Sequence, residues 1–155
     1  MDENWPAEEI KPMKILEWPN ELLTTPCPHY EFKTFTEDLR NAILLGELME
    51  RTEKCAGLAA NQVGILRRFF VTKGRRGKVN YFFNPAIIKK RMGLVWGKEG
   101  CLSFPGKTTD VPRWKTIEVE FWDEKCNHVK VQYRDYEARV FQHELDHLNG
   151  LLIFK

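Results

Sequence analysis

The stretch Phe141-Gln142-His143-Glu144-Leu145-Asp146-His147-Leu148 (FQHELDHL) sets the interpretation of this chain. His143 and His147 are four residues apart, so on a helix both imidazoles project from one face and can reach a single metal ion. Glu144 stands beside the first of them, where a carboxylate can remove a proton from a water molecule that the ion has made more acidic. The pattern therefore predicts hydrolytic chemistry. Its alternative is a polar helix that carries two ordinary exposed histidines.

The residues around this stretch predict a helix over 136–148. Asn149 and Gly150 follow it, and both residue types tolerate the left-handed backbone that ends many helices. An earlier helix is expected to begin near Thr34, because Thr34 and Glu37 have the spacing of a capping box. Apolar residues recur at helical spacing after it, and this helix should end before Gly57.

The middle of the chain predicts strands. Residues 68–72 and 79–83 flank the glycine-containing segment 73–78, a pattern that is typical of a β-hairpin. Residues 116–121 alternate polar and apolar side chains, so Ile117, Val119 and Phe121 should face the core, with 129–133 as the partner strand. The predicted class is therefore α+β, with antiparallel or mixed sheets around a C-terminal metal-binding helix.

Length and composition indicate one folded domain. The 155 residues suit a single core, and no repeat or linker divides the chain, so 1–155 is predicted to be one domain. Hydrophobic residues make up 43% and charged residues 30%, which excludes a disordered or fibrous protein. The net charge of +2 is too small to indicate a nucleic-acid-binding protein. The basic runs 73–78 and 89–91 are interpreted as solvated turns in preference to a contact patch.

The cysteines and the N-terminal segment bear on the compartment. Four widely spaced cysteines without a C-x-x-C pair favour reduced thiols in a cytosol. Residues 1–10 are acidic and lack the apolar run of a signal peptide. No apolar stretch approaches the ~20 residues that cross a bilayer. We expect a cytoplasmic protein without membrane contact.

The third metal ligand is expected upstream of the two histidines. The tail 148–155 contains no His, Cys, Asp or Glu, although metalloproteases with this motif usually take their third ligand from further along the chain. Cys101, in Glu99-Gly100-Cys101-Leu102-Ser103, is our candidate, since one thiolate and two imidazoles leave a fourth position open for catalysis. The other candidates, which lack comparable context, are Cys27, Cys55, Cys126 and His128. For each thiol an inert structural role is the alternative.

Three separated segments, taken together and in this order, resemble the peptide deformylase family. They are Gly57-Leu58-Ala59-Ala60-Asn61-Gln62, Glu99-Gly100-Cys101-Leu102-Ser103 and Gln142-His143-Glu144-Leu145-Asp146-His147. The similarity extends from about Ile15 to Ile153. Enzymes of this family remove the formyl group from the initiator methionine of new bacterial chains, so the resemblance implies a metal-dependent hydrolase that acts on formylated nascent peptides and releases formate.

The resemblance also implies roles for individual residues. Cys101, His143 and His147 would hold one divalent metal ion, Fe(II) natively, with Zn(II) or Ni(II) as alternatives. Glu144 would act as general base and then as general acid, passing the proton of the attacking water to the departing amine. Two hydrogen-bond donors would stabilise the formyl oxygen as it gains negative charge. These are the side chain of Gln62 and the backbone N–H of Leu102.

The remaining implied roles concern substrate binding and support. Gly57 would let the backbone approach an extended peptide that binds like an added strand. An ion pair between Glu99 and Arg113 would support the loop that carries Cys101. The resemblance also implies an apolar pocket for the methionine side chain, in which Arg139 could take part only through its aliphatic stem. The residues implied to contact the substrate are Gly57, Leu58, Tyr136, Arg139 and Val140.

The chain departs from the family pattern in two places. Cys55 stands where the first motif usually has a glycine, which bears on the local loop conformation. The sequence ends at Lys155, where many bacterial members continue into a C-terminal helix linked to ribosome docking, and in this it resembles short phage forms. The expected partners are formylated nascent peptides, with at most a weak ribosome contact and no direct nucleic-acid specificity. The expected location is the cytoplasm of a bacterium, or of the bacterial host of a phage.

Two other functions stay open at this point. The H-E-x-x-H pattern by itself also fits a zinc aminopeptidase or small metalloprotease. A metal-stabilised module that binds nascent chains without turning them over is the non-enzymatic alternative. The presence of both Glu144 and Gln62 argues against that module, because a protein that only binds has no need of a base beside the metal.

Overall fold

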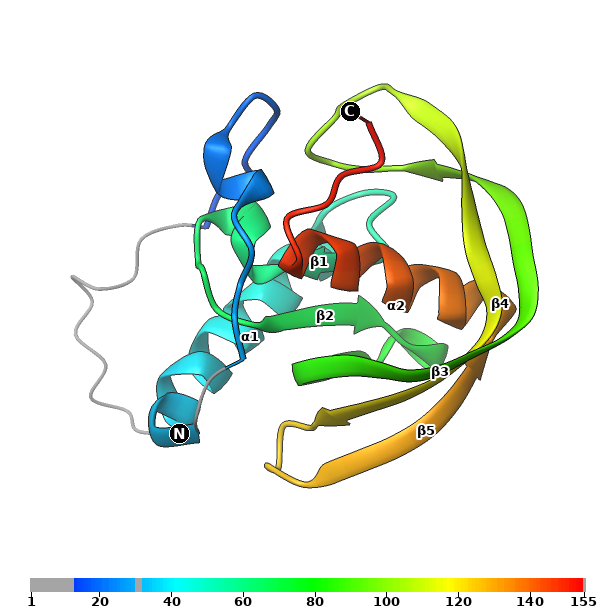
Figure 1. Cartoon of the computed structure of the whole chain (residues 1–155). Coiled ribbons are helices and arrows are strands. Elements are labelled where there is room, and N and C mark those ends of the chain that lie inside the picture. Colours follow the sequence, from blue (N-terminus) through cyan, green and yellow to red (C-terminus); the bar gives the residue numbers. More distant parts are fainter. Residues whose placement is uncertain (1–12, 30–31, 155) are drawn as a thin grey trace.

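The computed structural model describes residues 13–29 and 32–154, and the prediction for residues 1–10 lies outside them. The described residues form two α-helices and five strands (Figure 1). The helices are α1 (Phe35–Arg51) and α2 (Asp135–Leu148). The strands are β1 (Gly57–Ala59), β2 (Phe69–Lys73), β3 (Val79–Gly100), β4 (Thr108–Trp122) and β5 (His128–Arg134).

The five strands make one antiparallel sheet in the order β1-β2-β3-β4-β5. Three register shifts interrupt the pairing of β3 with β4, and irregularities of this kind bend a sheet and increase its twist. The sheet consequently curves around α2, and the long β3–β4 hairpin rises past the N-terminal end of that helix (Figure 1). The fold is α+β, as predicted, with α2 in the concavity of the sheet.

The predicted elements agree with the structure over most of their length. The hairpin forms with Phe69 opposite Phe83 and Lys73 opposite Val79. Ile117, Val119 and Phe121 are buried on β4, and β5 is its partner strand. What local patterning did not predict is the length of β3, whose residues 88–96 are exposed and carry no burial pattern.

The predicted capping box at the start of α1 does not form. Thr34 is the N-cap residue, but its side chain makes no capping hydrogen bond. Its hydroxyl instead donates to Asp38 Oδ2 at 3.1 Å and accepts from Arg67 Nη2 at 2.5 Å. Hydrogen bonds with Asp38, one turn further along α1, and with Arg67 have therefore replaced the capping hydrogen bond.

Two hydrophobic clusters hold the helices on the sheet. Ala42, Leu45 and Met49 of α1 pack against one region of the sheet, and the second cluster lies between α2 and the strands. In the second cluster Phe141 of α2 meets Phe70 edge to face, with ring centroids 5.1 Å apart. This packing fixes the height of α2 above the sheet and hence the position of its polar face. Neither α1 nor α2 is long and apolar enough to cross a membrane.

Candidate metal centre

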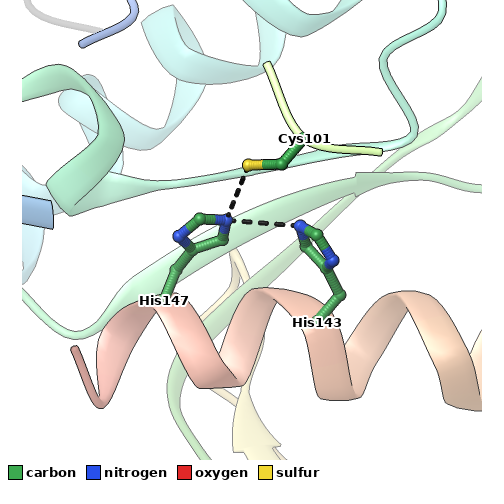
Figure 2. A group of neighbouring side chains, drawn as sticks. All are labelled: Cys101, His143 and His147. Atoms are coloured by element: carbon green, nitrogen blue, oxygen red, sulfur yellow. Dashed lines mark hydrogen bonds between the residues drawn. The ribbon is translucent and has the colours of Figure 1, made fainter. Parts of the chain in front are cut away.

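Helix α2 and the loop after β3 bring three ligand-type side chains together (Figure 2). His147 Nε2 lies 3.2 Å from His143 Nε2 and 3.3 Å from Cys101 Sγ. The ligand atoms of all three residues lie within 4.8 Å of one another. The histidines are one turn apart on α2, and Cys101 approaches from the opposite side. This is a compact N₂S donor set.

The pairing of β3 with β4 places Cys101 beside the two histidines. Gly100, the last residue of β3, pairs with Thr108, so residues 101–107 close the end of the hairpin over α2. Within that loop Phe104 N donates to Cys101 O at 2.9 Å, a turn that presents the thiol inward. Residues 101–107 form neither a helix nor a strand.

Glu99 organises the side of the cluster next to β3. Its carboxylate accepts two hydrogen bonds from Arg113, from Nε and Nη2, both at 2.9 Å. Its Oε1 also lies 2.8 Å from His143 Nδ1, which leaves Nε2 of that ring facing the cluster. Burial raises the pKa of Glu99, but the hydrogen bonds from His143 and Arg113 outweigh it and lower the pKa to about 2. A charged Glu99 is therefore held at neutral pH.

Arg113 has a second partner that the sequence did not indicate. Its Nη1 donates to the carboxylate of Asp146 on α2. One guanidinium on β4 thus binds both Glu99, near the end of β3, and Asp146 on the helix of the histidines. The spacing of these residues along the chain carries no signal for the contact, because it depends on the curvature of the sheet.

The guanidinium of Arg139 is held by oxygens of the β3–β4 hairpin, so only the aliphatic stem of this residue could border a methionine side chain. Its Nη1 donates to Glu99 Oε2 at 2.6 Å and to Val111 O at 2.9 Å, and its Nη2 donates to Val95 O at 2.6 Å. The guanidinium therefore clamps the β3–β4 hairpin to α2. A Cβ on Gly97 would lie 2.9 Å from it, so the absence of a side chain there makes room for the clamp.

Gln62 is buried, not a surface amide. Its Oε1 accepts from Ala59 N at 3.0 Å, which orients the amide so that Nε2 faces the cluster. That nitrogen is 3.3 Å from Ser103 Oγ and 3.7 Å from Cys101 Sγ. The amide group is thus fixed with its donor end toward the donor set.

Glu144 is buried beside the histidines, and its Oε2 has no hydrogen-bond partner among the described residues. Its Oε1 is 4.0 Å from His143 Nε2. Burial raises the pKa of Glu144 to about 7 against the lowering effect of His143 and Arg113. Gly57 packs against this side chain, since a Cβ there would lie 3.0 Å from Cγ and Oε1 of Glu144.

A cavity of about 570 Å³ opens onto the cluster. Gly57, Leu102, Tyr136, Arg139 and Val140 line it together with Cys101, His143 and Glu144. Leu58 is a different case, because its side chain is fully buried in the core with Phe69 and Ala60. Leu58 is not among the residues that line the cavity.

Cys55 also lines this cavity. Its thiol is buried and donates to Gly57 O at 3.4 Å. Burial, and secondarily the negative charge of Glu144, raise the pKa of Cys55 to about 12. The thiol that replaces the family's glycine is therefore neutral, and it contacts the backbone of the first motif.

Comparison with known proteins identifies the family. The family model for polypeptide deformylase matches residues 12–155. The chain belongs to the polypeptide deformylase family. The peptide deformylase of Borreliella burgdorferi is 37% identical over 142 residues, which cover 90% of this chain and 84% of that protein.

Solved deformylase structures share the fold. The peptide deformylase of Thermotoga maritima superposes with a TM-score of 0.81 at 34% identity, covering 91% of this chain and 94% of that one. A probable peptide deformylase from the Synechococcus phage S-SSM7 gives a TM-score of 0.80 at 34% identity, covering 90% and 96%. The chain is accordingly a deformylase, an enzyme that removes the N-formyl group from nascent peptides. The family is metal-dependent, which agrees with the cluster of ligand atoms.

Proposed function

We propose that this deformylase acts through one divalent metal ion held by Cys101, His143 and His147, with Glu144 as general base and then general acid. The observation that carries the proposal is the convergence of a thiol and two imidazole nitrogens within 4.8 Å, with a buried, unpartnered carboxylate oxygen beside them. The substrate would be the formyl group on the initiator methionine, and the products formate and the free amine.

The three side chains fit a divalent cation. Burial lowers the pKa of His143, but its hydrogen bonds with Cys101 and Glu99 outweigh this effect and raise the pKa to about 10, so the surroundings favour positive charge at this ring. Burial, and secondarily His143, lower the pKa of His147 well below its ordinary value, which leaves a neutral imidazole able to donate a lone pair. Thiolate and imidazole donors suit Fe(II), Zn(II) and Ni(II); we propose Fe(II) as the native ion.

Glu144 would transfer a proton from the attacking water to the departing amine. A bound ion supplies Lewis acidity, which lowers the pKa of a nearby water and polarises the formyl carbonyl. With a pKa raised to about 7 by burial, the Glu144 carboxylate is basic enough to accept a proton and acidic enough to return it. Its free Oε2 would take the proton from water as the oxygen attacks the formyl carbon. It would then deliver that proton to the methionine nitrogen as the C–N bond breaks.

Gln62 and Leu102 would stabilise the formyl oxygen. The amide of Gln62 is fixed by Ala59 with Nε2 toward the cluster, so the donor is oriented before substrate arrives. The backbone N–H of Leu102 would supply a second donor from the loop that carries Cys101. Donors that need no reorientation favour the charged transition state over the neutral carbonyl.

The substrate chain would lie along the free edge of β1. Among the described residues this strand pairs with β2 on one side only, so its other edge can accept an added strand. Gly57 and the backbone of Leu58 would make these contacts, while Tyr136, Val140 and the stem of Arg139 would border the methionine side chain. Glu99 and Arg113 would hold the Cys101 loop in register with α2.

Replacing Gly57 with alanine tests how closely the first motif packs against the base. The new methyl would meet Glu144 at about 3.0 Å and push its carboxylate aside. Because small displacements of catalytic groups are costly, we expect kcat/KM to fall roughly 10- to 100-fold with metal content unchanged. In Gly100→Ala the Cβ lies 3.6 Å from its nearest neighbours, and that variant should lose less. Equal losses in both variants would contradict the packing argument.

The proposed substrate also indicates where the enzyme acts and which partners it binds. We propose that residues 1–155 act as one domain in the cytoplasm of a bacterium or of a phage's bacterial host, where formylated chains are made. Any ribosome contact would be weak, and nascent peptides are the main partner.

The direct test is formate release from formyl-Met-Ala-Ser by protein purified without oxygen and loaded with Fe(II). Unformylated Met-Ala-Ser is the matched substrate and should not be cleaved. Hydrolysis of the unformylated peptide without formate release would indicate a peptidase, and tight binding of the formylated peptide without turnover would indicate a binding module.

A further inference from the structure

A second and larger cleft, of about 980 Å³, adjoins the one that opens onto the metal cluster. Tyr136 and Val140 line both clefts, so the two share a wall in the N-terminal half of α2. The floor of the second cleft is aromatic, with Phe82 packed edge to face against Phe141 and Tyr133. Apart from Tyr136 and Val140, the residues that line this cleft have no part in the mechanism proposed above.

The rim of the second cleft is cationic. It includes four basic side chains, Lys73, Arg75, Lys78 and Arg134, and two carboxylates, Asp135 and Glu137. Arg75 Nε lies 3.2 Å from Glu137 Oε1, so these two charges are paired. Among the lining residues three exposed cations then remain against one carboxylate. The turn 73–78, interpreted from sequence as merely solvated, thus forms one wall of a cavity.

The strand pairing relates the direction of the substrate to this cleft. Gly57 packs against Glu144 and pairs with Thr72 of β2, and Lys73 N donates to Ala56 O at 2.9 Å. A peptide that lies along residues 57 and 56 and leads away from Glu144 therefore runs toward the end of β2. Lys73 and the turn that follows it are at that end.

The geometry points to a binding site for the part of the formylated chain that follows the methionine, with a preference for acidic residues there. This inference rests on the proposed function, because it takes the smaller cleft as the methionine site. The wall shared by the two clefts and the apolar floor of the second favour a peptide, since its backbone would enter from the cleft beside the metal cluster and its side chains would alternate between floor and rim. RNA would bind through its phosphates, so it would use the cations of the rim and would have no need of the apolar floor.

The kcat/KM values of formylated peptides that differ in length and charge test the inference. Formyl-Met peptides of three, five, seven and nine residues are prepared in two series that end in Asp-Asp or in Lys-Lys. For the wild-type enzyme loaded with Fe(II), the ratio of kcat/KM between the acidic and basic series should rise from near one at three residues. Because exposed ion pairs are individually weak, about a three- to tenfold ratio is expected at nine residues. Raising the salt concentration should reduce it.

Charge reversal provides the matched comparison. The double variant Lys73→Glu and Lys78→Glu should bring the ratio for nine-residue peptides to one or below. The double variant Lys89→Glu and Lys90→Glu makes the same change in net charge at exposed positions on β3 and should keep the wild-type ratio. Formyl-Met-Ala-Ser serves as the reference substrate for each variant.

Three results would overturn the inference. One is a wild-type ratio near one at every length while the tripeptide is turned over normally. Another is an equal change of the ratio in both double variants, which would mean that net charge alone acts. The third is a length-independent ratio together with loss of RNA binding only in the Lys73 and Lys78 variant, which would assign the rim to RNA. No turnover of the tripeptide by the wild type would remove the proposed function as well.

Discussion

Glu144→Gln should retain the metal ion but lose most of its activity, with kcat for formyl-Met-Ala-Ser lower by about 10²- to 10⁴-fold, the usual contribution of a positioned acid–base group. Glutamine matches glutamate in volume and carries no charge to desolvate, so the buried position beside Gly57 should accept it. It has no oxygen that can take and return a proton at neutral pH. The loss should therefore fall on kcat, while metal content and the melting temperature stay close to those of the wild type.

The matched control is Glu47→Gln, the same substitution at an exposed position on α1, which should leave kcat within about twofold because surface changes are usually small in effect. Formate release and metal content are measured on the same preparations. A fully active Glu144→Gln enzyme would remove Glu144 from the proposed role. A variant that has lost both metal and activity would instead show that this carboxylate supports the metal site.

Cys101→Ala should abolish both stable metal binding and deformylation. Two imidazoles alone would remain, and removing a direct ligand should weaken affinity by more than the roughly 10- to 100-fold typical of changes around a metal site. Metal that binds only the folded protein also stabilises it. Adding Fe(II) should therefore raise the melting temperature of the wild type and leave that of Cys101→Ala nearly unchanged.

The same substitution at Cys126 supplies the comparison, because that cysteine is free and exposed. Cys126→Ala should keep full metal content, the metal-dependent rise in melting temperature and normal formate release. If Cys101→Ala bound the metal as tightly as Cys126→Ala does, the third ligand would have to be sought elsewhere and the site proposed here would be wrong. Both variants remove one thiol, so a general effect of thiol oxidation cancels between them.

Much of the fold could be predicted because its signals are local. The spacing of His143 and His147, the alternation of residues 116–121 and the turn at 73–78 each place side chains on a face or reverse the chain within a few residues. The structure has α2, β4 and the β2–β3 hairpin where these patterns put them. The resemblance between separated motifs then indicated the deformylase family, which the family match confirmed.

The arrangement of the site depends on contacts that no local pattern contains. Cys101 reaches His147 only because β3 and β4 pair out to Gly100 and Thr108, and because the bulged sheet curves over α2. The same curvature brings the carbonyl oxygens of Val95 and Val111 to the guanidinium of Arg139, a residue that also lines the cavity. Leu58 lies in the core for a related reason, since the pleat of an edge strand decides which side chains face inward.

The sequence by itself determined the class of fold, the helix that carries His143, Glu144 and His147, and the family of the enzyme, because periodicity and short motifs are properties of neighbouring residues. Only the tertiary structure decided how Glu99 is shared among Arg113, Arg139 and His143, and that the turn 73–78 borders a cleft next to the catalytic one. Strand register and sheet curvature set these contacts, and both arise from the packing of the whole chain around α2.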